Sequence, residues 1–222
     1  MPNPPDARRD LAAARLVDRP RIRTGASETE LAIFRATETL LEQRPFAELS
    51  VAQILEGAGL SRASFYHYFS SKLGVVAGLL VNVMDEVFAV ASPFLTRPAM
   101  TMVESLRVSI NSALELWGTH RVLLRVVMEH WPASPELEIQ WQGAMSRFAD
   151  AIAAEVDALR EQGALPPGLP SIELARALVW STERCLYIAG RGNELELPGE
   201  QAWSDTLVTL WAGTLQLGSP QS

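Results

Sequence analysis

The sequence predicts an all-α fold of about nine helices, organised as a small N-terminal part and a larger C-terminal part. Apolar residues recur at intervals of three and four along most of the chain, as at Leu106, Ile110 and Leu114, which is the spacing of one helix face. Capping boxes mark helix starts at Ser27 and Ser50, and Gly or Pro separates successive apolar stretches. With 222 residues, of which 48% are apolar and 20% charged, the chain can bury a substantial core.

The N-terminal segment, residues 1–26, is rich in Pro, Ala and Arg, and we predict that it forms a disordered basic arm. Arg21 and Arg23 are nearest to the folded part, so they are the best candidates for contact with phosphates or a minor groove. A leader that only improves solubility explains the same composition equally well. We therefore divide the chain into this arm, a first domain at 27–72 and a second domain at 73–222.

Three helices are expected in the first domain. The first covers residues 28–43 and begins at the capping residue Ser27. The second begins at Ser50 and ends in a glycine-containing turn at Gly59, because glycine tolerates the left-handed conformation of a helix stop. The third is short and is capped by Ser61. Two short helices joined by a tight glycine-containing turn are typical of a helix-turn-helix.

The last of these three helices has two different sides. We predict that Leu60, Phe65 and Phe69 are buried, which leaves a strip of Arg, Ser, Tyr and His with little core to join. Such a strip at the start of a helix suits contacts with base edges and phosphates. Glycine-containing turns also occur in many all-α proteins, and the Tyr-His-Tyr run could be ordinary half-buried surface. Spacing alone leaves both interpretations open.

The segment AGLSRASFYHYFSSK, residues 58–72, resembles the signature of the TetR family of bacterial transcriptional regulators. The similarity extends back through apolar positions between residues 33 and 54. The resemblance implies a DNA-binding domain in which Arg62 donates to a guanine edge, His67 approaches a base and neighbouring side chains contact phosphates. The DNA-binding residues implied in this way are Ser50, Ser61, Arg62, Ala63, Ser64, Tyr66, His67, Tyr68 and Lys72.

The next helix is expected to begin near Ser70 and to connect the two domains. We predict that it ends near Ser92, because Pro93 cannot continue the hydrogen-bond ladder of a helix. Gly74 and Gly78 lie inside this helix, where each costs about 1 kcal/mol relative to alanine. Close packing and helix bending are both possible reasons for these glycines.

Five further helices are predicted in the second domain, bounded by Gly, Pro or polar caps. They cover residues 102–118, 120–131, 135–162, 171–189 and 200–217. We expect the last two to pair with their copies in a second chain as a four-helix bundle, which gives a homodimer. The candidate interface residues are Trp203, Thr206, Leu207 and Leu210, although interface and core positions are hard to separate in sequence.

The formal net charge of -7 at first argues against a partner that is a nucleic acid. The acidity, however, belongs to the second domain. Residues 1–72 carry ten Lys and Arg against nine Asp and Glu, whereas residues 73–222 carry nine against seventeen. A local patch in the first domain can therefore still bind DNA.

Other bulk features favour a cytoplasmic protein without catalytic or metal chemistry. The single cysteine, Cys185, excludes an internal disulfide, and we expect it to pack as a small apolar residue rather than to act as a redox sensor. We find no apolar run near the roughly 20 residues needed to span a bilayer, and no signal peptide. His67, His120 and His130 lack the spacing of metal ligands, and no phosphate-binding or nucleophile motif is present. We predict no cofactor, no metal and no enzymatic activity.

The aromatic residues of the second domain suggest a cavity. All six tryptophans lie there. A set of seven large side chains comes from four predicted helices: Trp117, Trp141, Met145, Phe148, Trp180, Tyr187 and Trp211. Such a set could line an apolar site for a small molecule. A dry aromatic core explains the same composition, so the residues alone do not decide.

A second resemblance bears on this choice. Three segments, residues 117–120, 154–164 and 183–187, are similar to the EthR group of the TetR family. The resemblance implies a long, mostly apolar pocket, with Val179 and Thr182 standing where that group has asparagines, so the pocket wall should be less polar. The implied pocket residues are Leu106, Ala113, Trp117, Trp141, Met145, Phe148, Ile152, Val179, Thr182, Glu183, Leu186, Tyr187 and Trp211.

Together, these features predict a homodimeric repressor that binds a near-palindromic operator and is released by a small apolar ligand. An activator, or a repressor that responds to no ligand, fits the same sequence features. A hypothesis of a different class is a helical enzyme or lipid carrier that retains a vestigial helix-turn-helix.

Overall fold

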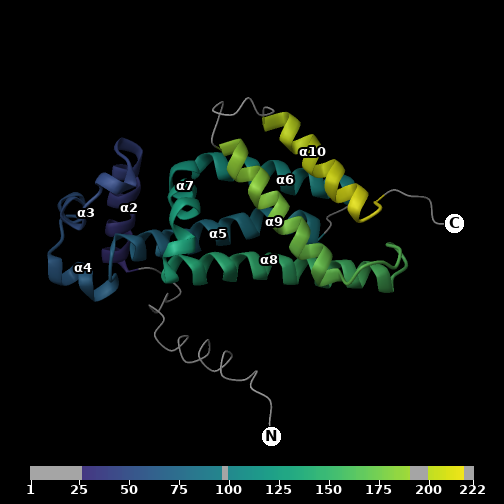
Figure 1. Cartoon of the computed structure of the whole chain (residues 1–222), viewed down its shortest axis with the longest axis horizontal. Coiled ribbons are helices and arrows are strands. Elements are labelled where there is room, and N and C mark those ends of the chain that lie inside the picture. Colours follow the sequence, from purple (N-terminus) through teal and green to yellow (C-terminus); the bar gives the residue numbers. More distant parts are fainter. Residues whose placement is uncertain (1–26, 97–99, 191–199, 218–222) are drawn as a thin grey trace, which may run out of the picture. The chain divides into compact units, whose positions relative to one another are not determined.

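The structure, a computed structural model, describes residues 27–96, 100–190 and 200–217. These residues are all-α, as predicted (Figure 1). The chain divides into two compact units, Met1–Gly78 and Leu79–Ser222, so the division falls within a helix and later than the boundary at residue 72 drawn from the sequence. The predicted basic arm at 1–26, with Arg21 and Arg23, lies outside the described residues.

Within the described ranges there are nine α-helices and two short 3-10 helices, η2 and η3, in the predicted order. Their bounds are α2 Glu28–Gln43, η2 Phe46–Glu48, α3 Val51–Ala58, α4 Arg62–Tyr68, α5 Lys72–Thr96, α6 Met102–Thr119, α7 Arg121–His130, η3 Trp131–Ala133, α8 Pro135–Glu161, α9 Ser171–Gly190 and α10 Glu200–Thr214.

Hydrogen bonds within the first turn fix the starts of the helices in the first unit. At α2, the backbone N–H of Ser27 donates to Glu30 Oε2 at 2.8 Å, and the backbone N–H of Glu30 donates to Ser27 Oγ at 3.2 Å. Ser50 and Gln53 form the same reciprocal pair at the start of α3. Gly59 ends α3 with φ of 67°, the left-handed conformation that favours glycine. The predicted helix starts and this stop are confirmed.

An aromatic core joins α2, α4 and the first turns of α5. The ring of Phe69 lies 5.5 Å from that of Phe34 and 5.9 Å from that of Phe65, measured between centroids. Gly78 of α5 faces these rings, and a Cβ atom at this position would lie 2.9 Å from two ring carbons of Phe34. Close packing is therefore the reason for the glycine at position 78.

The connecting helix α5 does not end before Pro93 as predicted, but continues to Thr96. Proline has no N–H to donate, so the helical ladder is interrupted at this residue. Ser109 of α6 compensates nearby: its hydroxyl accepts from the backbone N–H of Phe94 at 3.1 Å and donates to the carbonyl of Ala91 at 3.2 Å. A side chain distant in sequence therefore contacts the backbone of α5 on both sides of the proline.

The second unit is a helical bundle. Figure 1 shows α9 crossing α8 and α10 lying beside α6, and these helices are in contact. The second half of α5 packs on α8, where Asp85 pairs with Arg147 at 2.6 Å and the ring of Phe88 lies 5.2 Å from that of Phe148. Side chains from several helices therefore converge on one interior.

The segment Lys72–Ala91 of α5 is long and apolar enough to qualify as a membrane span by length and composition, contrary to the expectation from the sequence. Its apolar residues have another explanation, since Val75, Val76 and Leu80 are fully buried in the fold. The core helix of a globular protein passes the same test, so this segment is weak evidence for a membrane.

The close approach at Gly78 predicts that Gly78→Ala destabilises the protein, even though alanine favours a helix. Overpacking a core typically costs about 1–3 kcal/mol, against about 1 kcal/mol gained in helix propensity, so we expect a net loss of about 1 kcal/mol. The measurement is the free energy of unfolding by chemical denaturation. Gly143→Ala on α8 is the matched control, because a Cβ there has no neighbour within 4 Å. Equal stabilisation by both substitutions would contradict the packing role.

Candidate functional site

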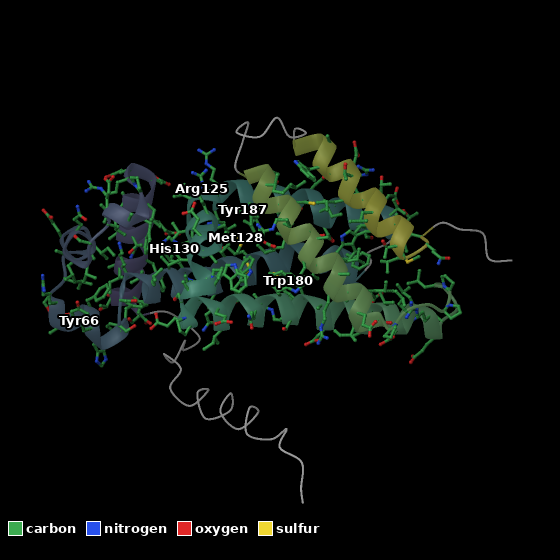
Figure 2. The ribbon with its side chains drawn as sticks, in the orientation of Figure 1. Tyr66, Arg125, Met128, His130, Trp180 and Tyr187 are labelled. Carbon is green, nitrogen blue, oxygen red and sulfur yellow. The ribbon has the colours of Figure 1, made fainter. Side chains whose placement is uncertain are left out.

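The short helix α4 keeps one side on the core and presents the other to solvent. Phe65 is fully buried, whereas Tyr66 (labelled in Figure 2) is 56% exposed and packs edge-on against Phe65 with ring centroids 5.3 Å apart. The half-buried Tyr68 lies 4.9 Å from the ring of His67. The exposed members of the predicted strip are Ser61, Arg62, Ala63, Tyr66 and His67, while Ser64 is half-buried. The strip is therefore accessible to a partner.

Two of the predicted DNA-binding residues, Ser50 and Ser61, are helix caps. Ser50 Oγ accepts from the backbone N–H of Gln53 at 3.3 Å and donates to Gln53 Oε1 at 2.9 Å. Ser61 Oγ accepts from the backbone N–H of Ser64 at 3.2 Å and lies 2.9 Å from Ser64 Oγ. Both serines remain exposed, so they fix the starts of α3 and α4 while staying at the surface.

Lys72, which was predicted to contact phosphates, has its ammonium group engaged within the protein. Its Nζ donates to the carbonyls of Phe46 at 2.8 Å and Leu49 at 2.7 Å, lies 3.5 Å from that of Ala47, and sits 4.4 Å from the centre of the Phe46 ring. An ammonium group has three hydrogens, and these carbonyls engage them. Burial lowers the pKa of Lys72, in agreement with an internal contact. The first residue of α5 therefore holds the segment between α2 and α3.

The second unit contains a cavity of about 110 Å³. Helices α5, α6, α8, α9 and α10 line it, and the lining is almost entirely apolar. The predicted pocket residues that line it are Leu106, Ala113, Trp117, Met145, Phe148, Ile152, Val179, Thr182, Glu183, Leu186 and Trp211. The interior is therefore not fully packed at the place that the resemblance indicated.

Two predicted pocket residues do not line the cavity. Trp141 is fully buried and packs edge-on against Trp117, with ring centroids 6.3 Å apart, so it contacts a lining residue instead. Tyr187 (labelled in Figure 2) is half-buried on α9, and its ring lies 5.2 Å from the guanidinium carbon of Arg184. Helical spacing could not separate these aromatic residues from their neighbours on the same helices.

Other residues that line the cavity were not predicted, namely Met84, Val87, Ala91, Phe94, Ser109, Ile110 and Ala151. Four of them belong to α5, which is apolar on several sides, so its sequence does not indicate which residues face a cavity. Ile110 could have been found, because it follows Leu106 by four positions and precedes Ala113 by three, which places all three on one face of α6.

Three lining residues bring polar side chains to this apolar space. The hydroxyl of Ser109 is engaged by α5, and Thr182 Oγ1 accepts from Trp211 Nε1 at 2.8 Å. Glu183 is 4% exposed, and its Oε1 has no hydrogen-bond partner. Its Oε2 lies 4.0 Å from Nε of Arg184, at the limit of an ion pair. Burial raises the pKa of Glu183, and the charge of Arg184 opposes this shift only in part.

The predicted interface residues of α10 point in different directions. Leu207 is fully buried within its own chain, so it cannot contact a second chain and its assignment is corrected. The reason is that α10 packs on α6 and α9, and Leu207 lies on that inner side. Thr206 and Leu210 are exposed, and Trp203 is half-buried.

The other singled-out side chains have structural contacts. Cys185 is half-buried, and burial raises the pKa of its thiol, which lowers its reactivity. His120 Nε2 lies 3.4 Å from a carboxylate oxygen of Glu86, and His130 Nδ1 lies 2.9 Å from the carbonyl of Val126. Among the residues that the structure describes, no group of three or more His, Cys, Asp or Glu side chains could hold a metal ion.

Comparison with known proteins agrees with this geometry. Residues 33–79 match the family model of the bacterial regulatory proteins of the TetR family. The HTH-type transcriptional regulator EthR of Mycobacterium tuberculosis is 36% identical over 194 residues, which cover 87% of this chain and 89% of the relative. The EthR protein of Mycolicibacterium smegmatis is 31% identical over 205 residues, covering 89% and 92%. The chain belongs to the TetR family of bacterial transcriptional regulators.

The second unit is similar to a narrower group within this family. Residues 106–215 match the model of the C-terminal domain of the transcriptional regulator EthR. The chain is thus an EthR-like member, and its relatives regulate transcription rather than catalyse a reaction.

Solved structures show the same fold at low sequence identity. The fatty acid degradation regulator FadR of Bacillus halodurans has a TM-score of 0.69 at 16% identity, covering 87% of this chain and 100% of that one. FadR of Bacillus subtilis, solved with stearoyl-CoA, has a TM-score of 0.65 at 16% identity, covering 81% and 96%. They support an N-terminal helix-turn-helix domain followed by a helical domain.

The contacts of Lys72 predict that Lys72→Met lowers the stability of the first unit. Methionine keeps the apolar stem but removes the ammonium donor from the carbonyls of Phe46 and Leu49, and the carbonyl of Phe46 then keeps only the backbone N–H of Leu49. We expect a loss of about 1–2 kcal/mol in the free energy of unfolding, measured by chemical denaturation. Arg62→Ala, at an exposed position, should change stability by less than about 0.5 kcal/mol. A Lys72→Met variant as stable as wild type would show that these hydrogen bonds do not support the fold.

The environment of Glu183 predicts a specific pH dependence. Because burial raises the pKa of its carboxyl group in the folded state above the unfolded value, ionisation costs folding free energy, and this cost disappears as the pH falls through the folded pKa. Glu183→Gln cannot ionise. The free energy of unfolding of wild type should therefore rise relative to that of Glu183→Gln as the pH is lowered from about 8 towards about 5. If the free energies of unfolding of the two proteins change equally with pH over this range, the raised pKa is contradicted.

Proposed function

We propose that this regulator is a repressor that acts in the cytoplasm, binds a near-palindromic operator as a homodimer and leaves the operator when a small, mostly apolar ligand occupies its cavity. The single observation that carries the proposal is the continuity of α5. This helix provides Lys72, which holds the segment preceding α3, and it also provides Met84, Val87 and Phe94 to the cavity wall.

DNA recognition is proposed for the exposed side of α4. Arg62 is its first residue and is exposed, and a guanidinium group can bond a guanine edge through two donors. Tyr66 and His67 are also exposed and suit contacts with phosphates and bases. In a dimer, two such helices would enter successive major grooves about 34–36 Å apart.

The dimer is proposed to form through α9 and α10, which would meet their copies as a four-helix bundle. Leu210 is 43% exposed on α10 and Trp180 is 38% exposed on α9, so both helices present large apolar side chains to solvent. Thr206 and Trp203 complete the proposed interface, from which Leu207 is now excluded because it is buried in its own chain.

Release is proposed to be a population shift. A ligand lowers operator affinity only if it binds better to the conformation that cannot hold both recognition helices in register. Since α5 lines the cavity, a ligand that displaces Met84 or Phe94 would move this helix, and Lys72 would carry the displacement to the carbonyls that precede α3.

The test starts with selection of operator sequences from a random duplex library by the purified wild-type protein. Arg62→Ala should then lose about 1–3 kcal/mol of binding free energy, or roughly 10- to 100-fold in affinity, as measured by fluorescence anisotropy. Arg125→Ala is the control, because Arg125 is also an exposed arginine and lies on α7 of the second unit. Wild-type affinity in the Arg62→Ala variant would contradict the assignment of α4 as the recognition helix.

The oligomeric state on DNA is measured separately, by the mass of the complex with one selected site. Two chains on a site with inverted half-sites support the homodimer, and a single chain contradicts it. Whether bound protein blocks or stimulates transcription from the selected site in vitro decides between a repressor and an activator.

A further inference from the structure

One buried side chain in the cavity is not explained by packing. Glu183 lies on α9, lines the cavity and is 4% exposed, yet its Oε1 has no hydrogen-bond partner. A buried polar atom without a partner costs about 1–3 kcal/mol, so it calls for an explanation. The other two polar lining residues, Ser109 and Thr182, already have partners within the protein. Glu183 is thus left with an open bonding position in an apolar space.

We propose that Glu183 selects a basic ligand, so that the effector of this protein is an apolar molecule carrying an amine rather than a fatty acid, an acyl ester or a neutral hydrocarbon. This inference rests on the proposed function of the cavity and specifies its ligand class. The amine would donate a hydrogen bond to Oε1 of Glu183, and the apolar part would lie among side chains such as Trp117, Phe148 and Trp211.

The charges around the cavity support an amine. Among the described residues that line it, Glu183 is the only ionisable one, and no Lys, Arg or His lines it. Among the side chains that the structure describes, Arg184 is the cation recorded beside the carboxylate; it lies 4.0 Å from Oε2, is 56% exposed and faces the ring of Tyr187. Arg184 is therefore directed toward the outside of α9, and the side of Glu183 that faces the cavity has no positive charge to balance it.

The charge of the group placed next to Glu183 distinguishes an amine from a carboxylate and an alcohol. An ammonium group beside a carboxylate, or a neutral amine beside a carboxylic acid, forms a pair without net charge, wherever the proton lies. Hydrogen bonds with a charged partner are stronger than neutral ones. A ligand carboxylate would instead place a second acid next to Glu183, which is unfavourable unless an additional proton is bound. A neutral alcohol can bond Oε1 but does not balance the charge.

The experiment compares three ligands of equal chain length: n-decylamine, 1-decanol and sodium decanoate. Binding to the full-length protein is followed by quenching of tryptophan fluorescence, which Trp117 and Trp211 report from the cavity wall. We expect decylamine to bind wild type at least about tenfold more tightly than decanol, and decanoate to bind most weakly. Decylamine should also release the protein from its selected operator at a lower concentration than decanol does.

Two variants separate a specific site from general attraction of a cation to an acidic protein. Glu183→Gln should reduce decylamine binding by about tenfold and leave decanol binding within about twofold of wild type. Glu115→Gln is the matched control, since it removes an exposed carboxylate from α6 and should leave the affinity for both ligands unchanged. Unchanged decanol binding also shows that the cavity of the Glu183→Gln variant is intact. If the Glu183→Gln variant also loses affinity for decanol, the order of the three affinities for wild type decides whether the cavity prefers an amine.

The outcomes distinguish this inference from the proposed function. Equal binding of decylamine and decanol, with no effect of Glu183→Gln, overturns the selection of amines but leaves the cavity as a ligand site. Tightest binding by decanoate overturns it as well. If none of the three ligands binds wild type or changes operator affinity, both the inference and the ligand-released repressor are contradicted.

Discussion

The ammonium group of Lys72 is the contact on which the arrangement of the first unit depends. Its hydrogen bonds to the carbonyls of Phe46 and Leu49 tie down the segment between α2 and α3, which contains the short helix η2. Lys72 is also the first residue of α5, so the segment that precedes the helix-turn-helix is attached to a long helix rather than to a loop. A helix transmits a displacement along its axis, whereas a loop would absorb it.

What the sequence predicted well depends on short-range chemistry. The caps at Ser27, Ser50 and Ser61 each involve a residue three positions away, so a reader of the sequence has both partners in view. The errors concern partners distant in sequence. Helix α5 continues past Pro93 beside Ser109, which lies on α6, and the carbonyls that Lys72 contacts precede it by more than twenty residues. No local pattern contains this information.

The cavity shows the same limit in another form. Periodicity placed lining residues of α6 and α8 on one helix face, and the resemblance to the EthR group indicated those of α9. Neither could tell an inward residue that packs from one that borders empty space. Trp117 and Trp141 touch each other, yet only Trp117 lines the cavity. The lining residues of α5 could not be predicted for a related reason. A helix that is apolar on several sides has no single apolar face that indicates which residues point inward. Empty space is a property of the packed assembly, not of any one helix.

The acid at position 183 is best understood as a cost to folding that serves binding. A leucine there would match Leu186 one turn later, remove the unpartnered Oε1 and extend the apolar wall, so packing alone favours it. Natural proteins tolerate such unsatisfied groups mainly at functional sites, where a ligand supplies the missing partner. The same ligand would then bind most tightly to the conformation that leaves Oε1 open. A carboxyl group that weakens the empty protein can in this way provide the differential affinity on which a ligand-controlled switch depends.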